Sequence, residues 1–93
     1  MHLQETRRID TDKVRAMCIR NNYYTNGTNE DYNKMFQMCG LNFGVLAIAS
    51  DIFEHSNKER LMQESGCGKK DILENICFEL INDCSFTYVS IEE

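Results

Sequence analysis

Hydrophobic residues recur every three or four positions along most of this chain, which is the period of a helix that buries one face. In the stretch "IDTDKVRAMCIRNN" at 9–22, Val14, Met17 and Cys18 form such a stripe. Asp10 stands where a side chain caps the first amides of a helix, and the two asparagines are typical of a helix end. The pattern therefore predicts a first helix that begins after Asp10.

The next stretch, "NNYYTNGTNEDYNKMFQMCG" at 21–40, combines a polar turn with a second helix. Thr28 and Asp31 have the spacing of a capping box, so this helix is expected to begin after Thr28. Gly40 is expected to end it, because glycine tolerates the left-handed conformation of a helix terminus. Between them lies an apolar stripe at helical spacing, made of Tyr32, Met35, Phe36 and Cys39.

Two more helices are expected in the middle of the chain. The most hydrophobic segment follows Gly40, with Asn42 as its cap, and we expect it to be the central helix. Ser56 and Glu59 form a second apparent capping box, which predicts a short helix that ends at Gly66. The "GCGKK" that follows lacks the spacing of a phosphate-binding loop and is interpreted as a connection between helices.

The last helix is predicted to begin at Asp71, with Glu74 completing a capping box. Its apolar face is expected to contain Leu73, Ile76, Cys77, Leu80, Ile81 and Cys84. The period then changes, because "SFTYVSIEE" at 85–93 alternates and is rich in β-branched and aromatic residues, which predicts a strand. A single strand needs a partner. That partner is residues 2–8, a copy of the strand in a second subunit, or the edge of another protein.

These elements predict a mainly α fold, a compact single domain over 1–93 with four to five helices and a short C-terminal β-strand. The length suits one modest hydrophobic core. We expect that core to contain Val14, Met17, Tyr32, Met35, Phe36, Ile48, Ile52, Phe53, Leu73, Ile76, Leu80 and Ile81.

Composition narrows the classes of function. The chain has a net charge of −5, and only residues 1–20 carry an excess of basic side chains. A duplex-binding surface draws most of its affinity from basic groups that neutralise phosphates, so direct binding of nucleic acid is not expected. There is no stretch like a signal peptide at the N-terminus and no apolar run of the length that a membrane span requires, which favours a cytoplasmic protein.

Candidate catalytic and metal-binding groups are sparse. The five cysteines include no C-x-x-C pair, and three of them lie on predicted apolar faces, where we expect small buried hydrophobic side chains. His55 lies near a predicted helix end, and Asp51 and Glu54 form a carboxylate pair on what is interpreted as a solvated face. One histidine without further groups does not define an active site. We therefore expect no catalytic residue, no metal and no cofactor.

The adjacent Tyr23 and Tyr24 are the strongest candidates for a contact surface. Neighbouring side chains in an extended loop point apart, so one of the two rings is expected to remain exposed. Tyrosine anchors protein interfaces because it offers a large contact area at a low entropy cost. The predicted protein-binding residues are Tyr23, Tyr24, Asn26, Asn29, Glu30 and Asp31.

The segments "VRAMCIRNNYYTNGTNEDYNKMF" and "AIASDIFEHSN" resemble small uncharacterised helical proteins of phages and mobile elements of gut Firmicutes. This resemblance implies no activity and no site residue. It implies a genetic context that is rich in small inhibitors of host defence nucleases and in accessory regulators, an inference by association.

Three functions are therefore weighed. The first is an acidic protein-interaction module, an anti-CRISPR-like inhibitor of a host defence or nucleic-acid-handling enzyme with a basic groove. The second is a helix-turn-helix-like DNA-binding regulator, although the second helix at 28–40 has Lys34 as its one basic residue. The third, an enzyme, lacks a constellation of reactive groups. A homodimer through the C-terminal strand is a further expectation.

Overall fold

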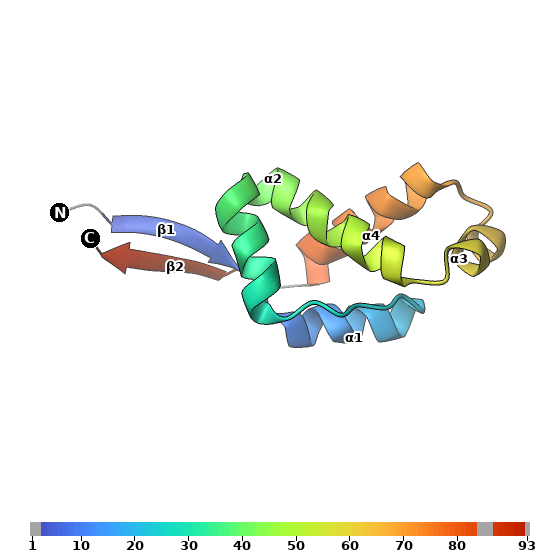
Figure 1. Cartoon of the computed structure of the whole chain (residues 1–93), viewed down its shortest axis with the longest axis horizontal. Helices are drawn as coiled ribbons and strands as arrows, with labels where there is room; N and C mark the ends of the chain where they lie inside the picture. The colour runs from blue at the N-terminus through green and yellow to red at the C-terminus, as the bar shows by residue number, and fades with distance from the viewer. Residues whose placement is uncertain (1–2, 84–86, 93) are drawn as a thin grey trace.

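The computed structural model of the chain describes residues 3–83 and 87–92. It is mainly helical, which confirms the predicted helical character of the fold. Figure 1 shows two strands that extend from a body of four helices. The elements in chain order are β1 (Leu3–Arg8), α1 (Thr11–Asn21), α2 (Asn29–His55), α3 (Lys58–Ser65), α4 (Lys69–Asp83) and β2 (Thr87–Glu92).

Two of the predicted helix starts are confirmed. The Asp10 side chain accepts a hydrogen bond from the amide of Asp12 and caps α1. Thr28 and Asp31 form a complete capping box at the start of α2, in which each side chain accepts from the backbone amide of the other residue. Both starts depend on residues within one turn of the helix, which is why the sequence pattern is sufficient to predict them.

Two other predicted caps are wrong. Ser56 ends α2, and the side chain that caps α3 is that of Asn57, which accepts from the amide of Arg60. Asp71 does not begin α4, because this helix already starts at Lys69. The asparagine beside Ser56 offers an equally good capping oxygen, so local sequence does not distinguish them.

Gly40 bends the chain within α2. Its φ of 79° and ψ of 179° are not helical, and they lie in a region that is essentially restricted to glycine. α2 therefore consists of a first half, 29–39, and a second half, 41–55, and the predicted break is confirmed. The helix resumes at Leu41, so the predicted cap at Asn42 is wrong. Gly44 faces the ring and the Cα of Phe36, where an added Cβ would clash, so the two halves pack closely beside the bend.

A single hydrophobic cluster lies between the four helices. Most of the predicted core is confirmed as buried: Val14, Met17, Tyr32, Phe36, Ile48, Ile52, Phe53, Ile76 and Leu80. Met35 and Leu73 are partly buried at its edge. Cys39 is exposed, so its place on a buried stripe was predicted wrongly. Cys18 is buried, as the stripe of the first helix predicted, and the cluster also contains residues that were absent from the predicted core: Ile9, Val45, Ala49, Leu61 and Ile72.

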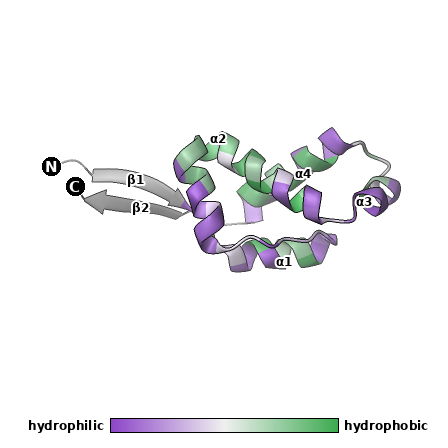
Figure 2. Cartoon of the chain, viewed as in Figure 1, coloured by the Kyte–Doolittle hydropathy of each residue, from purple (hydrophilic) through white to green (hydrophobic). Residues whose placement is uncertain are grey.

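The prediction for Ile81 is also wrong, because its side chain is 57% exposed. α4 is turned so that Ile72, Ile76 and Leu80 point into the core. The neighbouring stripe, which contains Ile81, is left at the surface. α4 thus has a wider apolar arc than the body of the protein covers. Figure 2 shows where hydrophobic residues lie along this helix.

The two strands pair with one another in antiparallel orientation. The register runs from Leu3 opposite Glu92 to Arg8 opposite Thr87. Of the three partners considered for the C-terminal segment, the structure therefore contains the N-terminal one. Cys84 and residues 85–86, which also entered the predictions, lie outside the described residues.

Candidate functional site

The loop at 22–28, which carries the predicted contact residues, is fixed at its start by backbone and side-chain hydrogen bonds. Asn22, which caps the C-terminal end of α1, has a left-handed conformation, and the amide of Tyr23 donates to the carbonyl oxygen of Cys18. The amide of Tyr24 donates to the hydroxyl of Ser56, which itself donates to the carbonyl oxygen of Ile52. The beginning of the loop is thereby held against the C-terminal end of α2.

The two tyrosines of the loop have different environments. Tyr23 is half-buried, and its hydroxyl accepts a hydrogen bond of 3.2 Å from the side-chain amide of Asn75 on α4. Burial raises the pKa of Tyr23. Tyr24 is 56% exposed. The prediction that one ring of the pair remains at the surface is confirmed, and that ring is Tyr24.

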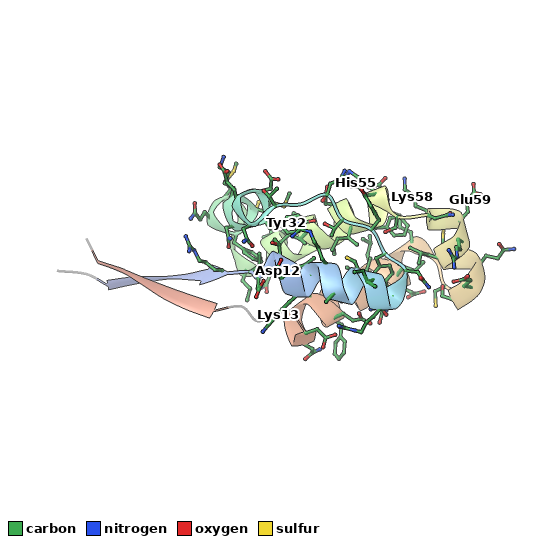
Figure 3. All side chains as sticks on the ribbon, turned by 90° about the horizontal axis from the view of Figure 1, so that it is seen from below. Asp12, Lys13, Tyr32, His55, Lys58 and Glu59 are labelled. Carbon is green, nitrogen blue, oxygen red and sulfur yellow. The ribbon has the colours of Figure 1, made fainter. Side chains whose placement is uncertain are left out.

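The end of the loop rests on Tyr32, the first core residue of α2. The Tyr32 hydroxyl is hydrogen-bonded to the hydroxyl of Thr25, and its ring fills the space where Gly27 would otherwise carry a side chain. A guanidinium nitrogen of Arg15 donates to the carbonyl oxygen of Gly27 over 3.1 Å, which ties the loop to α1. Figure 3 shows Tyr32 inside the helical body. Burial, with a contribution from Asp51, raises the pKa of Tyr32 strongly.

Two of the predicted contact residues have structural contacts of their own. The Asn29 side-chain oxygen accepts from the amide of Thr11 at 3.1 Å and from its hydroxyl at 2.8 Å, which fixes α2 to the start of α1. Asp31 belongs to the capping box. Asn29 and Asp31 are nevertheless exposed, as are Tyr24, Asn26 and Glu30, so Tyr23 alone of the six predicted residues is half-buried. Glu30 pairs with Lys34 at 3.2 Å on the surface, an arrangement that contributes little to stability.

The exposed candidates do not form one compact patch. Tyr24 lies at the end of the loop that contacts Ser56, whereas Glu30 follows Asn29 at the end that contacts Thr11. Figure 1 shows that the loop between α1 and α2 runs beside α1, and Glu30 lies beyond the end of this loop, in the first turn of α2. Asp12, whose side chain is highly exposed, follows Thr11, which contacts Asn29 at this end of the loop. The sequence gives no signal for this neighbour, because it depends on the contact between Thr11 and Asn29.

His55 and Asp51 lie close together near the C-terminal end of α2. The Nδ1 atom of His55 lies 2.8 Å from the carbonyl oxygen of Asp51 and 3.4 Å from its carboxylate. The same carboxylate accepts from the Tyr32 hydroxyl at 3.1 Å. Glu54, the other member of the predicted carboxylate pair, instead binds Lys58 and Lys69 at the surface. Each of these side chains therefore has a structural contact. His55 and Glu54 bind neighbouring groups at the C-terminal end of α2, and Asp51 binds Tyr32 across the bend.

A hollow of about 630 Å³ lies where the start of α1 meets the start of α2. Its lining includes three basic residues, Arg8, Lys13 and Lys34, and two acidic residues, Asp10 and Glu30. Figure 3 shows Asp12 and Lys13 at this end of α1, beside the strand pair. Among residues 3–83 and 87–92, no group of three or more histidine, cysteine, aspartate or glutamate side chains is arranged to hold a metal ion.

By length and composition alone, α2 could span a membrane. The same helix is bent at Gly40 and supplies seven of the fifteen buried hydrophobic residues of the core, as the central helix of a globular protein does. The hydrophobic composition of α2 is therefore explained by its contribution to the core.

The sequence matches no family model, and no curated protein and no solved structure is similar enough to the chain to count as a match.

Proposed function

We propose that the chain is a small acidic protein-interaction module that binds a basic, nucleic-acid-handling enzyme through the loop at 22–28 and the first turn of α2. The observation that carries the proposal is the exposed ring of Tyr24 on a loop whose backbone is held at both ends. A fixed loop loses little conformational entropy when it binds, so an aromatic side chain on it contributes more of its contact energy to affinity.

Charge supports an acidic surface facing a basic partner. The chain has a net charge of −5, and the side chains of Glu30 and Asp12 are exposed, although each pairs with a base, Lys34 and Arg15 respectively. A groove that binds nucleic acid is lined with basic residues, which would attract such a surface and accelerate association. The resemblance to proteins of phages and mobile elements favours a host defence enzyme as the partner, so the proposed activity is anti-CRISPR-like inhibition in the cytoplasm.

The test compares DNA cleavage by purified RNA-guided nucleases with and without the protein. The wild-type chain should inhibit at least one of them, and inhibition should weaken as salt screens the charges. The double variant Tyr24→Ala/Glu30→Ala should inhibit at least about tenfold less well, because it removes an exposed anchor and a complementary charge. Its melting temperature should stay close to that of the wild type.

The matched control is Met38→Ala/Glu59→Ala, which also removes one exposed apolar side chain and one exposed carboxylate. It should inhibit as the wild type does. Equal inhibition by both double variants would show that the loop is only a connection between helices. No inhibition by the wild type across nucleases of several types would contradict the proposed class of partner.

A DNA-binding regulator is the second candidate, supported by the convergence of Arg8, Lys13 and Lys34 on one hollow. Two features weigh against it. The loop between α1 and α2 spans residues 22–28, which is longer than the three- to four-residue turn that joins helices in a helix-turn-helix motif. The hollow also contains two acidic residues. A salt-dependent mobility shift of duplex DNA, lost in Lys13→Ala/Lys34→Ala, would favour this candidate instead.

A further inference from the structure

A hollow of about 350 Å³ lies where the start of the loop at 22–28 meets α3 and α4. Leu61 and Ile72 form part of its wall, and both belong to the hydrophobic core. The half-buried Tyr23 also lines it, and we refer to it as the Tyr23 hollow. A concave site of this size, with an apolar wall and a few polar groups, is typical of the sites that bind small ligands.

Three side chains bring acceptor oxygens to the Tyr23 hollow. Asp71 and Asn75 are one turn apart on α4, and both line the hollow. The nitrogen of the Asn75 side-chain amide donates to the hydroxyl of Tyr23 over 3.2 Å, and no described residue donates to the oxygen of the same amide. The carboxylate, the amide oxygen and the hydroxyl therefore offer acceptors to a ligand.

The Tyr23 hollow has a negative charge that its surroundings leave uncompensated. Asp71 is the one charged side chain among the described residues that line it. The two lysines before Asp71 make contacts elsewhere, since the Nζ atom of Lys69 lies 3.6 Å from Glu54. Lys70 lines a different hollow. In the described part of the chain, no residue forms an ion pair or a hydrogen bond with the carboxylate of Asp71.

We infer that the Tyr23 hollow binds an alkylammonium group, a positively charged amine on a short apolar chain. An ammonium group has three N–H donors and no acceptor, so it matches a set of acceptor oxygens. A hydrogen bond to the carboxylate of Asp71 would be charge-assisted and therefore stronger than a neutral one. The apolar chain would lie against Leu61 and Ile72. A free amine and the lysine side chain of a protein partner share this chemistry.

This inference goes beyond the proposed function. Tyr24 is not among the described residues that line the Tyr23 hollow. A small amine also binds or fails to bind in the absence of any nuclease. Amine binding and nuclease inhibition can therefore fail separately.

The test titrates the full chain with n-butylamine, which is charged at pH 7, and follows the backbone amide chemical shifts by NMR. Binding should saturate with a dissociation constant on the order of 1 mM, as expected for so small a ligand. The largest shifts should occur at Tyr23, Asp71 and Asn75. n-Butanol has a similar apolar chain without the charge and should bind at least about tenfold more weakly.

Asp71→Asn removes the charge and keeps the shape of the side chain. It should raise the dissociation constant for butylamine at least about tenfold. Glu74→Gln is the matched control, because it removes an exposed carboxylate of α4 that does not line the Tyr23 hollow, and it should bind as the wild type does. Circular dichroism should show that both variants remain helical. Equal affinities of the two variants for butylamine overturn the proposal, and so do equal affinities of the wild type for butylamine and butanol.

The thiol of Cys67 provides a second measurement, on the wild type alone. Cys67 and Cys39 are both exposed, and of these two only Cys67 lines the Tyr23 hollow. Saturating butylamine should slow the alkylation of Cys67 by iodoacetamide at least about twofold, because alkylation requires access to the thiol, and should leave Cys39 unchanged. Equal rates at Cys67 with and without butylamine would place the amine elsewhere and overturn the proposal.

A further titration, with Nα-acetyl-lysine methylamide, identifies the source of the amine. An affinity similar to that of butylamine supports the lysine side chain of a protein partner as the ligand. A much weaker affinity supports a free amine in the same hollow. Saturable binding of neither compound overturns the proposal.

Discussion

The hydroxyl of Tyr32 donates a hydrogen bond to the carboxylate of Asp51 over 3.1 Å, and this contact joins the two halves of α2 across the bend at Gly40. The same hydroxyl is hydrogen-bonded to Thr25 in the loop before α2. One buried side chain thus connects the loop, the first half of α2 and the second half. The position of the proposed contact loop depends on this connection.

Replacing Tyr32 with phenylalanine should destabilise the protein by about 1–3 kcal/mol, because Asp51 and Thr25 each lose a partner while the ring remains in place. Urea denaturation of the wild type and the variant measures this difference. Tyr24→Phe is the control, since its ring is exposed, and it should change stability by less than about 0.5 kcal/mol. Equal stability of the two variants would show that the hydroxyl of Tyr32 does not hold the bend.

Gly40→Ala should destabilise the protein by about 1–3 kcal/mol, because a side chain is strained at a φ of 79° and a ψ of 179°. The space around Gly40 is open, so the cost comes from the backbone and not from a clash. Denaturation midpoints compare this variant with Cys39→Ala, which changes the exposed residue before it. A neutral Gly40→Ala would mean that the bend is not held in solution.

Ile52 lies in the centre of the core with no exposed surface. Ile52→Ala should therefore cost about 2–5 kcal/mol, from the lost burial and from the cavity that remains. Ile19→Ala removes the same atoms from an exposed position and should cost far less. Thermal unfolding followed by circular dichroism distinguishes them, and similar losses would contradict the assignment of the buried face of α2.

Features that depend on neighbouring residues were predictable from the sequence. The cap at Asp10, the capping box of Thr28 and Asp31, and the break at Gly40 each arise within one or two helical turns. The orientation of α4 was not predictable, because the helix carries two adjacent apolar rows of similar hydrophobicity. Which row is buried depends on packing against α1 and α2.

The candidate site also combines features that follow from neighbouring residues with features that depend on distant contacts. The presence of one exposed ring follows from the local geometry of two adjacent tyrosines. The identity of that ring does not, because Tyr23 is held by Asn75, which is 52 positions away in the sequence. The hydrogen bonds from Thr11 to the side chain of Asn29 were not predicted for a similar reason, since the two residues belong to different helices. Contacts between distant segments leave no periodic signal in the sequence.

Glu79 should make stability depend on pH. Burial, together with the charge of Asp83, raises its pKa above the ordinary value, although Arg20 and Asn21 oppose this. The folded protein therefore binds the proton more tightly than the unfolded chain does. The stability that Glu79 contributes is present at low pH, below its ordinary pKa, and is lost as the pH rises through the raised pKa.

Glu79→Gln keeps an oxygen that can accept from Asn21 but cannot ionise. The stability of this variant relative to the wild type should therefore increase between pH 4 and pH 7, by less than about 1 kcal/mol because the carboxylate is partly solvated. Urea denaturation at both pH values measures the change. Glu59→Gln removes one charge from the exposed surface and corrects for the general effect of net charge. If the two variants respond to pH in the same way, the ionised form of Glu79 is not disfavoured by its position between α4 and α1.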